Sequence, residues 1–198
     1  MEGSTNAMRV RGRPAAASRE DVLEAGLYRY LRGQRVDVQA IAAELGLGRA
    51  TIYRWFGSRD KLLGEVIIQA TEPVLAEVRS GLEGKGGPGL LETFDRFNRA
   101  LADAPALRAF VEQERDAALR LIASGAGIVQ PLIVELITGL IEEEVEAGTY
   151  EPPVEPAVLG YAIVKLAQAF LFNDQVAGIR GDVDRLREVE AALLGVPA

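Results

Sequence analysis

The sequence DVQAIAAELGLGRATIYRWFGSRDKLL, residues 37–63, contains two short helical patterns separated by a glycine-containing turn. Asp37 is a suitable N-cap for the first pattern, and Gly46 can adopt the left-handed conformation that ends a helix within one residue. In the second pattern, Ile52 and Phe56 lie four residues apart and therefore share one face, which is the buried one. A helix, a glycine turn and a second helix within about 20 residues predict a helix-turn-helix.

The second helix of this motif is too short to bury all of its sides. At least some of its arginine, tyrosine and threonine side chains must therefore face outward. Arginine binds guanine edges and phosphates, and hydroxyl groups of tyrosine and threonine reach phosphates. We therefore expect this helix to enter the major groove of DNA. A generic helical hairpin with a solvated charged face is the alternative interpretation.

The chain on both sides of this motif is also helical in pattern. Ser18 and Asp21 have the spacing of a capping box, which predicts a first helix over residues 18–32. The glycine-rich stretch at 83–89 is interpreted as a flexible break. No segment alternates with period two, so strands are not indicated. The sequence predicts an all-α fold of about nine helices. The remaining helices are expected near residues 37–45, 49–56, 58–79, 89–102, 105–123, 128–147, 154–177 and 182–194.

Composition and charge restrict the possible functions. The 198 residues include no cysteine and no histidine, which excludes disulfides, His/Cys metal sites and His-dependent catalytic triads or dyads. The net charge is −7, but residues 1–61 carry 11 basic and 7 acidic residues, and residues 62–198 carry 11 and 22. A basic N-terminal segment on an acidic remainder indicates a local contact with a polyanion. Without a signal peptide or a membrane-spanning apolar run, we expect a cytoplasmic protein with no membrane contact.

The run IAAELGLGRATIYRWFGSRDKLL, residues 41–63, resembles the DNA-binding signature of the TetR family of transcriptional repressors, and the resemblance extends over about residues 18–66. Gly48 departs from the family pattern, where Ser or Thr usually caps the recognition helix. Asp37 also departs from it, because an acidic side chain can cap a helix but repels a phosphate. The matching positions are Ile41, Ala42, Gly46, Leu47, Thr51, Ile52, Tyr53, Phe56, Ser58, Arg59, Asp60, Leu62 and Leu63.

The resemblance implies a set of DNA contacts. Arg49 and Arg54 would approach base edges, and other residues would hold phosphates. The full set implied for the two helices and the start of the next is Gln39, Arg49, Thr51, Tyr53, Arg54, Trp55 and Arg59. Upstream, RVRGRP at 9–14 is similar to the core of an AT-hook, in which Arg11 and Arg13 would enter a narrow minor groove. A solvated basic tail is the alternative for this segment.

The resemblance also implies the domain organisation. We expect a basic flexible arm over 1–17, of which 1–7 is an unstructured leader or an expression scar. A helix-turn-helix DNA-binding domain would follow over 18–64, and a helical effector-binding and dimerisation domain over 65–198. The segments RGRP (11–14), ATIYRWFGSR (50–59) and YAIVKLAQAFLFND (161–174) resemble the QsdR-like subgroup of the family, and this resemblance implies a lactone or acyl-type effector.

The C-terminal part contains candidate residues for both of its expected roles. Polar and aromatic residues within apolar helices are candidates for the effector pocket, namely Phe110, Gln113, Gln130, Tyr161, Gln168 and Phe172. Two apolar stripes at helical spacing are candidates for a homodimer interface, with packing inside one protomer as the alternative. These stripes contain Leu159, Ile163, Leu166, Phe170, Leu186 and Leu193.

The leading hypothesis is a dimeric repressor that binds a palindromic double-stranded operator and is released by a small apolar effector. A helical adaptor that never touches DNA is the second hypothesis. An enzyme that uses the carboxylates at 142–146 is the least favoured, because consecutive glutamates point around a helix rather than converge. We therefore expect no catalytic residues, no metal and no cofactor.

Overall fold

The computed structural model describes residues 17–123, 127–172 and 182–198, and within these ranges the fold is all-α, as predicted. The described residues form ten α-helices, one π-helical turn (Leu119–Ala123) and no strand. The helices are α1 (Arg19–Leu31), α2 (Val38–Glu44), α3 (Arg49–Phe56), α4 (Arg59–Arg79), α5 (Gly86–Asp103), α6 (Pro105–Gln113), α7 (Arg115–Ala118), α8 (Val129–Glu146), α9 (Pro156–Phe172) and α10 (Val183–Leu194).

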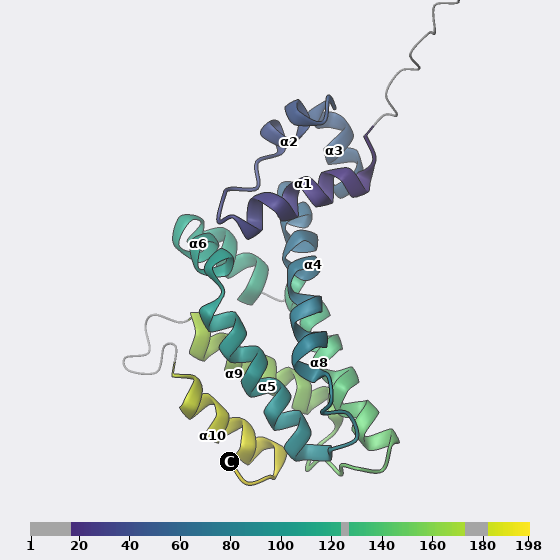
Figure 1. Cartoon of the computed structure of the whole chain (residues 1–198), viewed down its shortest axis with the longest axis vertical. Helices are drawn as coiled ribbons and strands as arrows, with labels where there is room; N and C mark the ends of the chain where they lie inside the picture. Colours follow the sequence, from purple (N-terminus) through teal and green to yellow (C-terminus); the bar gives the residue numbers. More distant parts are fainter. Residues whose placement is uncertain (1–16, 124–126, 173–181) are drawn as a thin grey trace, which may run out of the picture.

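Helices α1–α3 form a head at one end of an elongated molecule, and α4 runs from this head along the structure (Figure 1). At the other end, α5, α8, α9 and α10 pack together with the far half of α4 to form the body. Helix α6 lies between the two parts and packs against α1. No helix in the described ranges is long and apolar enough to cross a membrane.

The head is stabilised by capped helix ends and by a buried apolar core, both of which the sequence pattern predicted. The Ser18 Oγ accepts a hydrogen bond from the Asp21 amide (3.2 Å), and the Asp21 carboxylate accepts one from the Ser18 amide (2.6 Å), so the predicted capping box begins α1. Asp37 caps α2 by accepting from the Ala40 amide at 2.8 Å. Core residues of the head are continuous with residues of α6, α7 and the start of α8.

The stretch expected as one helix over 105–123 is divided at Glu114, which explains why there are more helices than predicted. Glu114 has φ −135° and ψ 50°, which is not a helical conformation. Its carboxylate bonds to Arg59 at 2.7 Å and lies 3.5 Å from Arg35, both close to the head. The break therefore lies where the body contacts the head.

The glycine-rich stretch at 83–89 is an ordered anchor rather than the flexible break that we expected. The carboxylate of Glu144 accepts hydrogen bonds from the amides of Gly84 (2.9 Å) and Gly86 (2.7 Å), from Thr149 Oγ1 (2.6 Å) and from Arg79. Burial by itself would raise the pKa of Glu144, but these four donors outweigh burial and lower it to about 2. Glycine is required here because a Cβ on Gly86 would lie 2.3 Å from the carbonyl oxygen of Thr149.

Candidate DNA-binding surface and effector cavity

The orientation of α3 in the head is fixed by the turn that precedes it and by its buried face. Gly46 has φ 64°, and the Leu47 amide donates to the Ala42 carbonyl oxygen at 2.8 Å, so backbone geometry closes the turn between α2 and α3. Ile52 and Phe56 are 1% and 4% exposed, and they bury the inner face of α3. The buried pair that the sequence predicted therefore determines which side of α3 faces outward.

The outer side of α3 carries Arg49, Tyr53 and Arg54, whose side chains are exposed. Gln39 on α2 is exposed as well. Neither Arg49 nor Arg54 forms a hydrogen bond or ion pair with any residue that the structure describes, so both guanidinium groups are available to an outside partner. This surface combines donors that can bind base edges and phosphates.

Three other residues that the resemblance assigns to DNA are less accessible. Thr51 and Trp55 are half-buried, and Trp55 also packs against the core that the head shares with α6. Arg59 differs most from the expectation, because its Nε donates to the Val36 carbonyl oxygen (2.8 Å) and its Nη2 to the Glu114 carboxylate (2.7 Å). This arginine therefore joins the head to the body, with two of its donors and its charge already engaged inside the protein.

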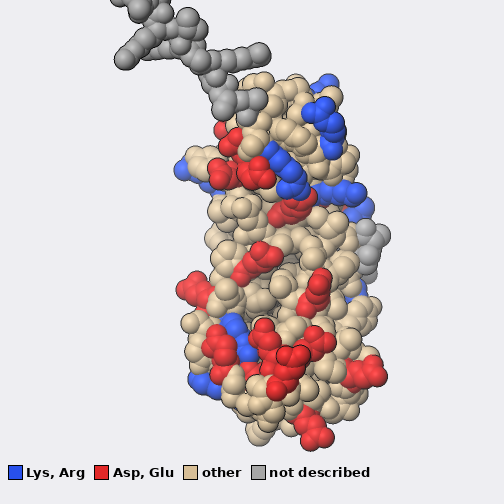
Figure 2. Space-filling model, turned by 90° about the vertical axis from the view of Figure 1, so that its right-hand side faces the viewer, with Lys and Arg blue, Asp and Glu red and all other residues tan. Residues whose placement is uncertain are grey.

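Charge is unevenly distributed along the molecule. On the face drawn in Figure 2, Lys and Arg side chains gather toward the end that holds the head, and Asp and Glu dominate the opposite end. This distribution matches the asymmetry between the two parts of the sequence. Arg11 and Arg13 lie outside the described residues, so their place in a minor groove stays a prediction.

The body, α6 and the end of α1 line a cavity of about 260 Å³, a little below the range of roughly 300–1,000 Å³ that is usual for ligand pockets. Its wall is formed by side chains of α1, α4, α5, α6, α8, α9 and α10 and of the π-helical turn, and most of them are apolar. Representative apolar wall residues are Ile67, Val74, Phe97, Leu101, Ile133 and Leu171. A wall of this composition suits a small apolar molecule.

Two of the six residues predicted for the effector pocket, Gln168 and Phe172, line this cavity. Gln168 is anchored because its Nε2 donates to the Ile122 carbonyl oxygen at 2.6 Å. Phe110 lies elsewhere, packed edge-on against the ring of Tyr30 with the two ring centroids 6.3 Å apart. The hydrophobic contact with the head, rather than a ligand, accounts for the burial of Phe110.

The other three predicted pocket residues also lie away from the cavity wall. Gln113 is at the head, where its Nε2 donates to the Gly33 carbonyl oxygen at 3.0 Å. Gln130 is buried in α8 outside the wall. Tyr161 is 51% exposed, and the Lys165 ammonium lies 5.6 Å from the centroid of its ring. The helical pattern indicated polar positions but not which side of each helix faces the cavity.

The sequence analysis missed two polar residues of the wall, Asn98 on α5 and Glu190 on α10. The Asn98 Nδ2 donates to Glu190 Oε1 at 2.9 Å, and Glu190 is fully buried. Burial raises the pKa of Glu190 to about 8. A sequence signal existed, because Glu190 lies four residues from both Leu186 and Leu194 and therefore shares their buried face.

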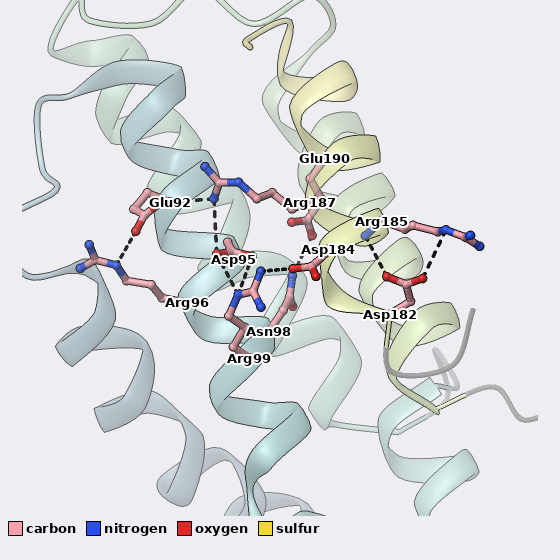
Figure 3. Close-up of polar contacts among 10 residues, drawn as sticks. All are labelled: Glu92, Asp95, Arg96, Asn98, Arg99, Asp182, Asp184, Arg185, Arg187 and Glu190. Atoms are coloured by element: carbon pink, nitrogen blue, oxygen red, sulfur yellow. Dashed lines mark hydrogen bonds and ion pairs between the residues drawn. The ribbon is translucent and has the colours of Figure 1, made fainter. Parts of the chain in front are cut away.

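Around this pair, α5 and α10 are joined by a network of ion pairs nearer the surface (Figure 3). Arg187 lies 3.3 Å from Glu92 and 3.4 Å from Asp95. Arg99 lies 3.1 Å from Asp95 and 2.5 Å from Asp184. These cations are paired with other carboxylates, and none of the described residues forms an ion pair with the buried Glu190.

The glutamate run near the end of α8 does not form a catalytic or metal-binding cluster. Glu144 is buried and faces Arg79, whereas Glu142, Glu143 and Glu146 are exposed. The described residues contain no group of three or more acidic side chains positioned to hold a metal ion. The side chains diverge around the helix, as the sequence predicted.

Most residues of the two apolar stripes predicted for a dimer interface face the interior of the protomer. Leu159, Ile163, Phe170 and Leu186 are between 0% and 8% exposed in a single chain, so they cannot form a contact between chains. Leu166 and Leu193 are half-buried, and Leu193 packs against the core of the body. The four buried residues therefore pack within one protomer, whereas a contact between chains through Leu166 or Leu193 stays a prediction.

Comparisons with known proteins agree with this architecture. A family model described as bacterial regulatory proteins of the tetR family matches residues 30–66, and one described as a tetracyclin repressor-like C-terminal domain matches residues 85–195. The transcriptional repressor QsdR from R. erythropolis, of the TetR family, is 28% identical; the match covers 91% of this chain and 95% of that chain, with a TM-score of 0.81.

The TetR family repressor AlkX from Dietzia sp. strain DQ12-45-1b, implicated in biodegradation of n-alkanes, is 24% identical, which supports the fold alone. That match covers 90% of this chain and 96% of that chain, with a TM-score of 0.59. A search of curated proteins finds no match. Because the C-terminal family model alone spans more than half of the sequence, the chain belongs to the TetR family, whose members are transcriptional regulators and not enzymes.

Proposed function

We propose that the protein is a repressor that binds a palindromic DNA operator as a homodimer and releases it when a small apolar effector enters the body. The observation that carries this proposal is the surface of α3, where Arg49, Tyr53 and Arg54 project from a base made by Ile52 and Phe56. A helix supported in this way can lie in a major groove. The 28% identity to the repressor QsdR over most of both chains supports the same assignment.

Within this proposal, the exposed arginines of α3 bind base edges, because a guanidinium can form two hydrogen bonds to one guanine. The hydroxyl groups of Thr51 and Tyr53 bind phosphates, and so does the indole N–H of Trp55. Gln39 contributes from α2. Arg59 is left out of this set because its Nε and Nη2 already bond to Val36 and Glu114 and its charge is paired with the Glu114 carboxylate.

The proposed division is a DNA-binding domain over 18–64 and an effector-binding and dimerisation domain over 65–198, preceded by the basic arm. Helix α4 belongs to both, since Leu63 and Val66 lie in the core shared with the head and Ala70 and Val74 line the cavity. A ligand that fills the cavity displaces α4 and changes the spacing of the two α3 helices in a dimer. Lactones and acyl compounds remain the predicted effector classes.

The proposed dimer contact is the outer side of α8 and α9 rather than the buried stripes. Leu132 is 39% exposed, Val158 55% and Tyr161 51%, which is unusual for large apolar side chains. Gly139 of α8 has open space where a Cβ would be, so a second chain can approach closely there.

Selection of bound DNA from a random library tests the DNA-binding part. We expect a palindromic site to be enriched, and Arg54→Ala to weaken binding to that site by about tenfold or more, since a bidentate base contact contributes about 1–3 kcal/mol. Arg185→Ala is the matched control, because it removes the same charge from an exposed position on α10.

If no DNA sequence is bound better than random DNA at physiological salt, the repressor proposal fails. The same result would favour the adaptor hypothesis if the head instead captured a protein. Size-exclusion chromatography with light scattering tests the dimer, and Tyr161→Glu should shift the protein toward monomer without unfolding it.

A further inference from the structure

The polar side chains in the cavity wall differ in how far their hydrogen bonds are satisfied. The Thr71 Oγ1 donates to the Ile67 carbonyl oxygen at 2.7 Å, and Gln168 donates to the Ile122 carbonyl oxygen. These groups are held by the protein backbone. They leave the wall close to apolar along α4 and the middle of α9.

The hydrogen bonds of Glu190 are only partly satisfied, unlike those of Thr71 and Gln168. Its side chain is fully buried, Oε1 accepts a hydrogen bond from Asn98, and Oε2 has no hydrogen-bond partner among the residues that the structure describes. Both side chains belong to the cavity wall, on α5 and α10. Buried polar groups are nearly always satisfied, so an unpaired carboxyl oxygen at a cavity indicates a partner that comes from outside the protein.

The surroundings of Glu190 favour its neutral form. On α5 it faces Asp95, whose negative charge disfavours ionisation, and on α10 Arg187 acts in the opposite direction while paired with Glu92 and Asp95. The only charged residue of α9 is Lys165, whose ammonium lies over the ring of Tyr161. Burial is the largest effect and raises the pKa of Glu190 to about 8. At neutral pH the carboxyl group is therefore mostly protonated and has one O–H to donate.

We propose that Glu190 and Asn98 form a head-group site for an uncharged amphiphile, with a hydrocarbon tail against the apolar wall and one carbonyl-type acceptor bonded to the Glu190 hydroxyl. This inference rests on the proposed function, because it assigns a ligand class to the effector cavity. The site disfavours three other classes of ligand, namely alkanes, carboxylates and amines. An alkane leaves Oε2 unpaired, a carboxylate adds a second acid to a buried one, and an amine requires an ionised Glu190.

Titration calorimetry on the full-length chain tests the site with ligands of matched length: methyl hexyl ketone, octane, octanoate and octylamine. The wild-type protein should bind the ketone about tenfold more tightly than octane, the difference expected for one buried hydrogen bond. Glu190→Leu should abolish this preference, and Glu190→Gln should keep it because the amide N–H replaces the hydroxyl. Glu188→Gln, at an exposed position on the same helix, is the control.

The pH dependence provides a second readout that a merely structural role would not change. Affinity for the ketone should fall above pH 8 by about tenfold in total, toward the affinity for octane, because the ionised carboxylate cannot donate. The Glu190→Gln variant should show no such fall. A preference for octylamine, or equal affinities for ketone and octane, overturns the head-group site.

The outcomes also separate this inference from the proposed function. If ketone and octane bind equally and both release the operator, the effector cavity stands and the head-group site fails. If none of the four ligands binds, both the head-group site and the effector part of the proposed function fail. Operator binding through α3 is measured without ligand and is unaffected by either result.

Discussion

Replacing Glu190 by glutamine should stabilise the protein at alkaline pH and leave its stability almost unchanged at acid pH. Burial raises the pKa of Glu190 from 4.5 to about 8 in the folded chain. The unfolded chain ionises at the ordinary value, so between these two pH values it gives up a proton that the folded chain retains. The free energy of unfolding of the wild-type protein therefore declines as the pH rises from 4.5 to 8. Glutamine has no proton to lose, so the variant lacks this contribution.

The size of the effect follows from the two pKa values. At about 1.4 kcal/mol for each pH unit, the gap between 4.5 and about 8 corresponds to at most about 5 kcal/mol. At neutral pH only the part between 4.5 and 7 has been lost, which is about 3 kcal/mol. The variant should be close to the wild-type protein below pH 4.5, because the neutral acid and the amide have similar size and both can bond to Asn98.

Urea unfolding at a fixed protein concentration, near pH 5, pH 7 and pH 9, measures this difference. The stability of Glu190→Gln minus that of the wild-type protein should grow over this series. For Glu188→Gln, an exposed position on the same helix, the difference should stay constant. A constant difference for Glu190→Gln as well would show that the carboxyl group is ionised in the folded protein and would refute the reasoning.

Three further substitutions test other parts of the structure. Glu144→Gln should cost about 3–5 kcal/mol in urea unfolding because it leaves Arg79 buried without its anion; a loss below 1 kcal/mol would contradict the role of this pair. Gly64→Ala should cost about 1–3 kcal/mol and lower Tm, since the new Cβ would lie 2.5 Å from Ile128 Cγ1, and an unchanged Tm would argue against this close contact of α4 with the start of α8. Asp37→Ala should cost about 1 kcal/mol and speed amide hydrogen exchange at the start of α2, whereas unchanged exchange would mean that the cap contributes nothing.

The sequence predicted the head well because local chemistry determines it. Asp37 as a cap, Gly46 at the turn and the pair Ile52 and Phe56 are each decided within a few residues, so spacing alone identifies them. The family resemblance covers the same segment. The contact between Arg59 and Glu114 was not predicted, because the two residues are distant in sequence.

The body was harder to predict because its details depend on contacts between distant helices. In the sequence, the glycines near residue 86 resemble a linker. In the structure, their backbone amides donate hydrogen bonds to the carboxylate of Glu144, which is 58 residues from Gly86. The apolar stripes that contain Leu159 and Leu186 are each equally consistent, in sequence, with packing inside a protomer or between protomers. Periodicity shows that a face is buried, but it does not show what buries it.

Arg59 also affects how ionic strength should act on this regulator. A basic side chain that binds a DNA phosphate displaces condensed cations, and each such contact adds about 0.9 to the slope of log affinity against log salt concentration. Arg59 is already neutralised by Glu114, so it displaces none. A dimer contains two copies, and a count of arginines would therefore overstate this slope by about two. The operator complex should consequently resist rising salt better than the sequence suggests.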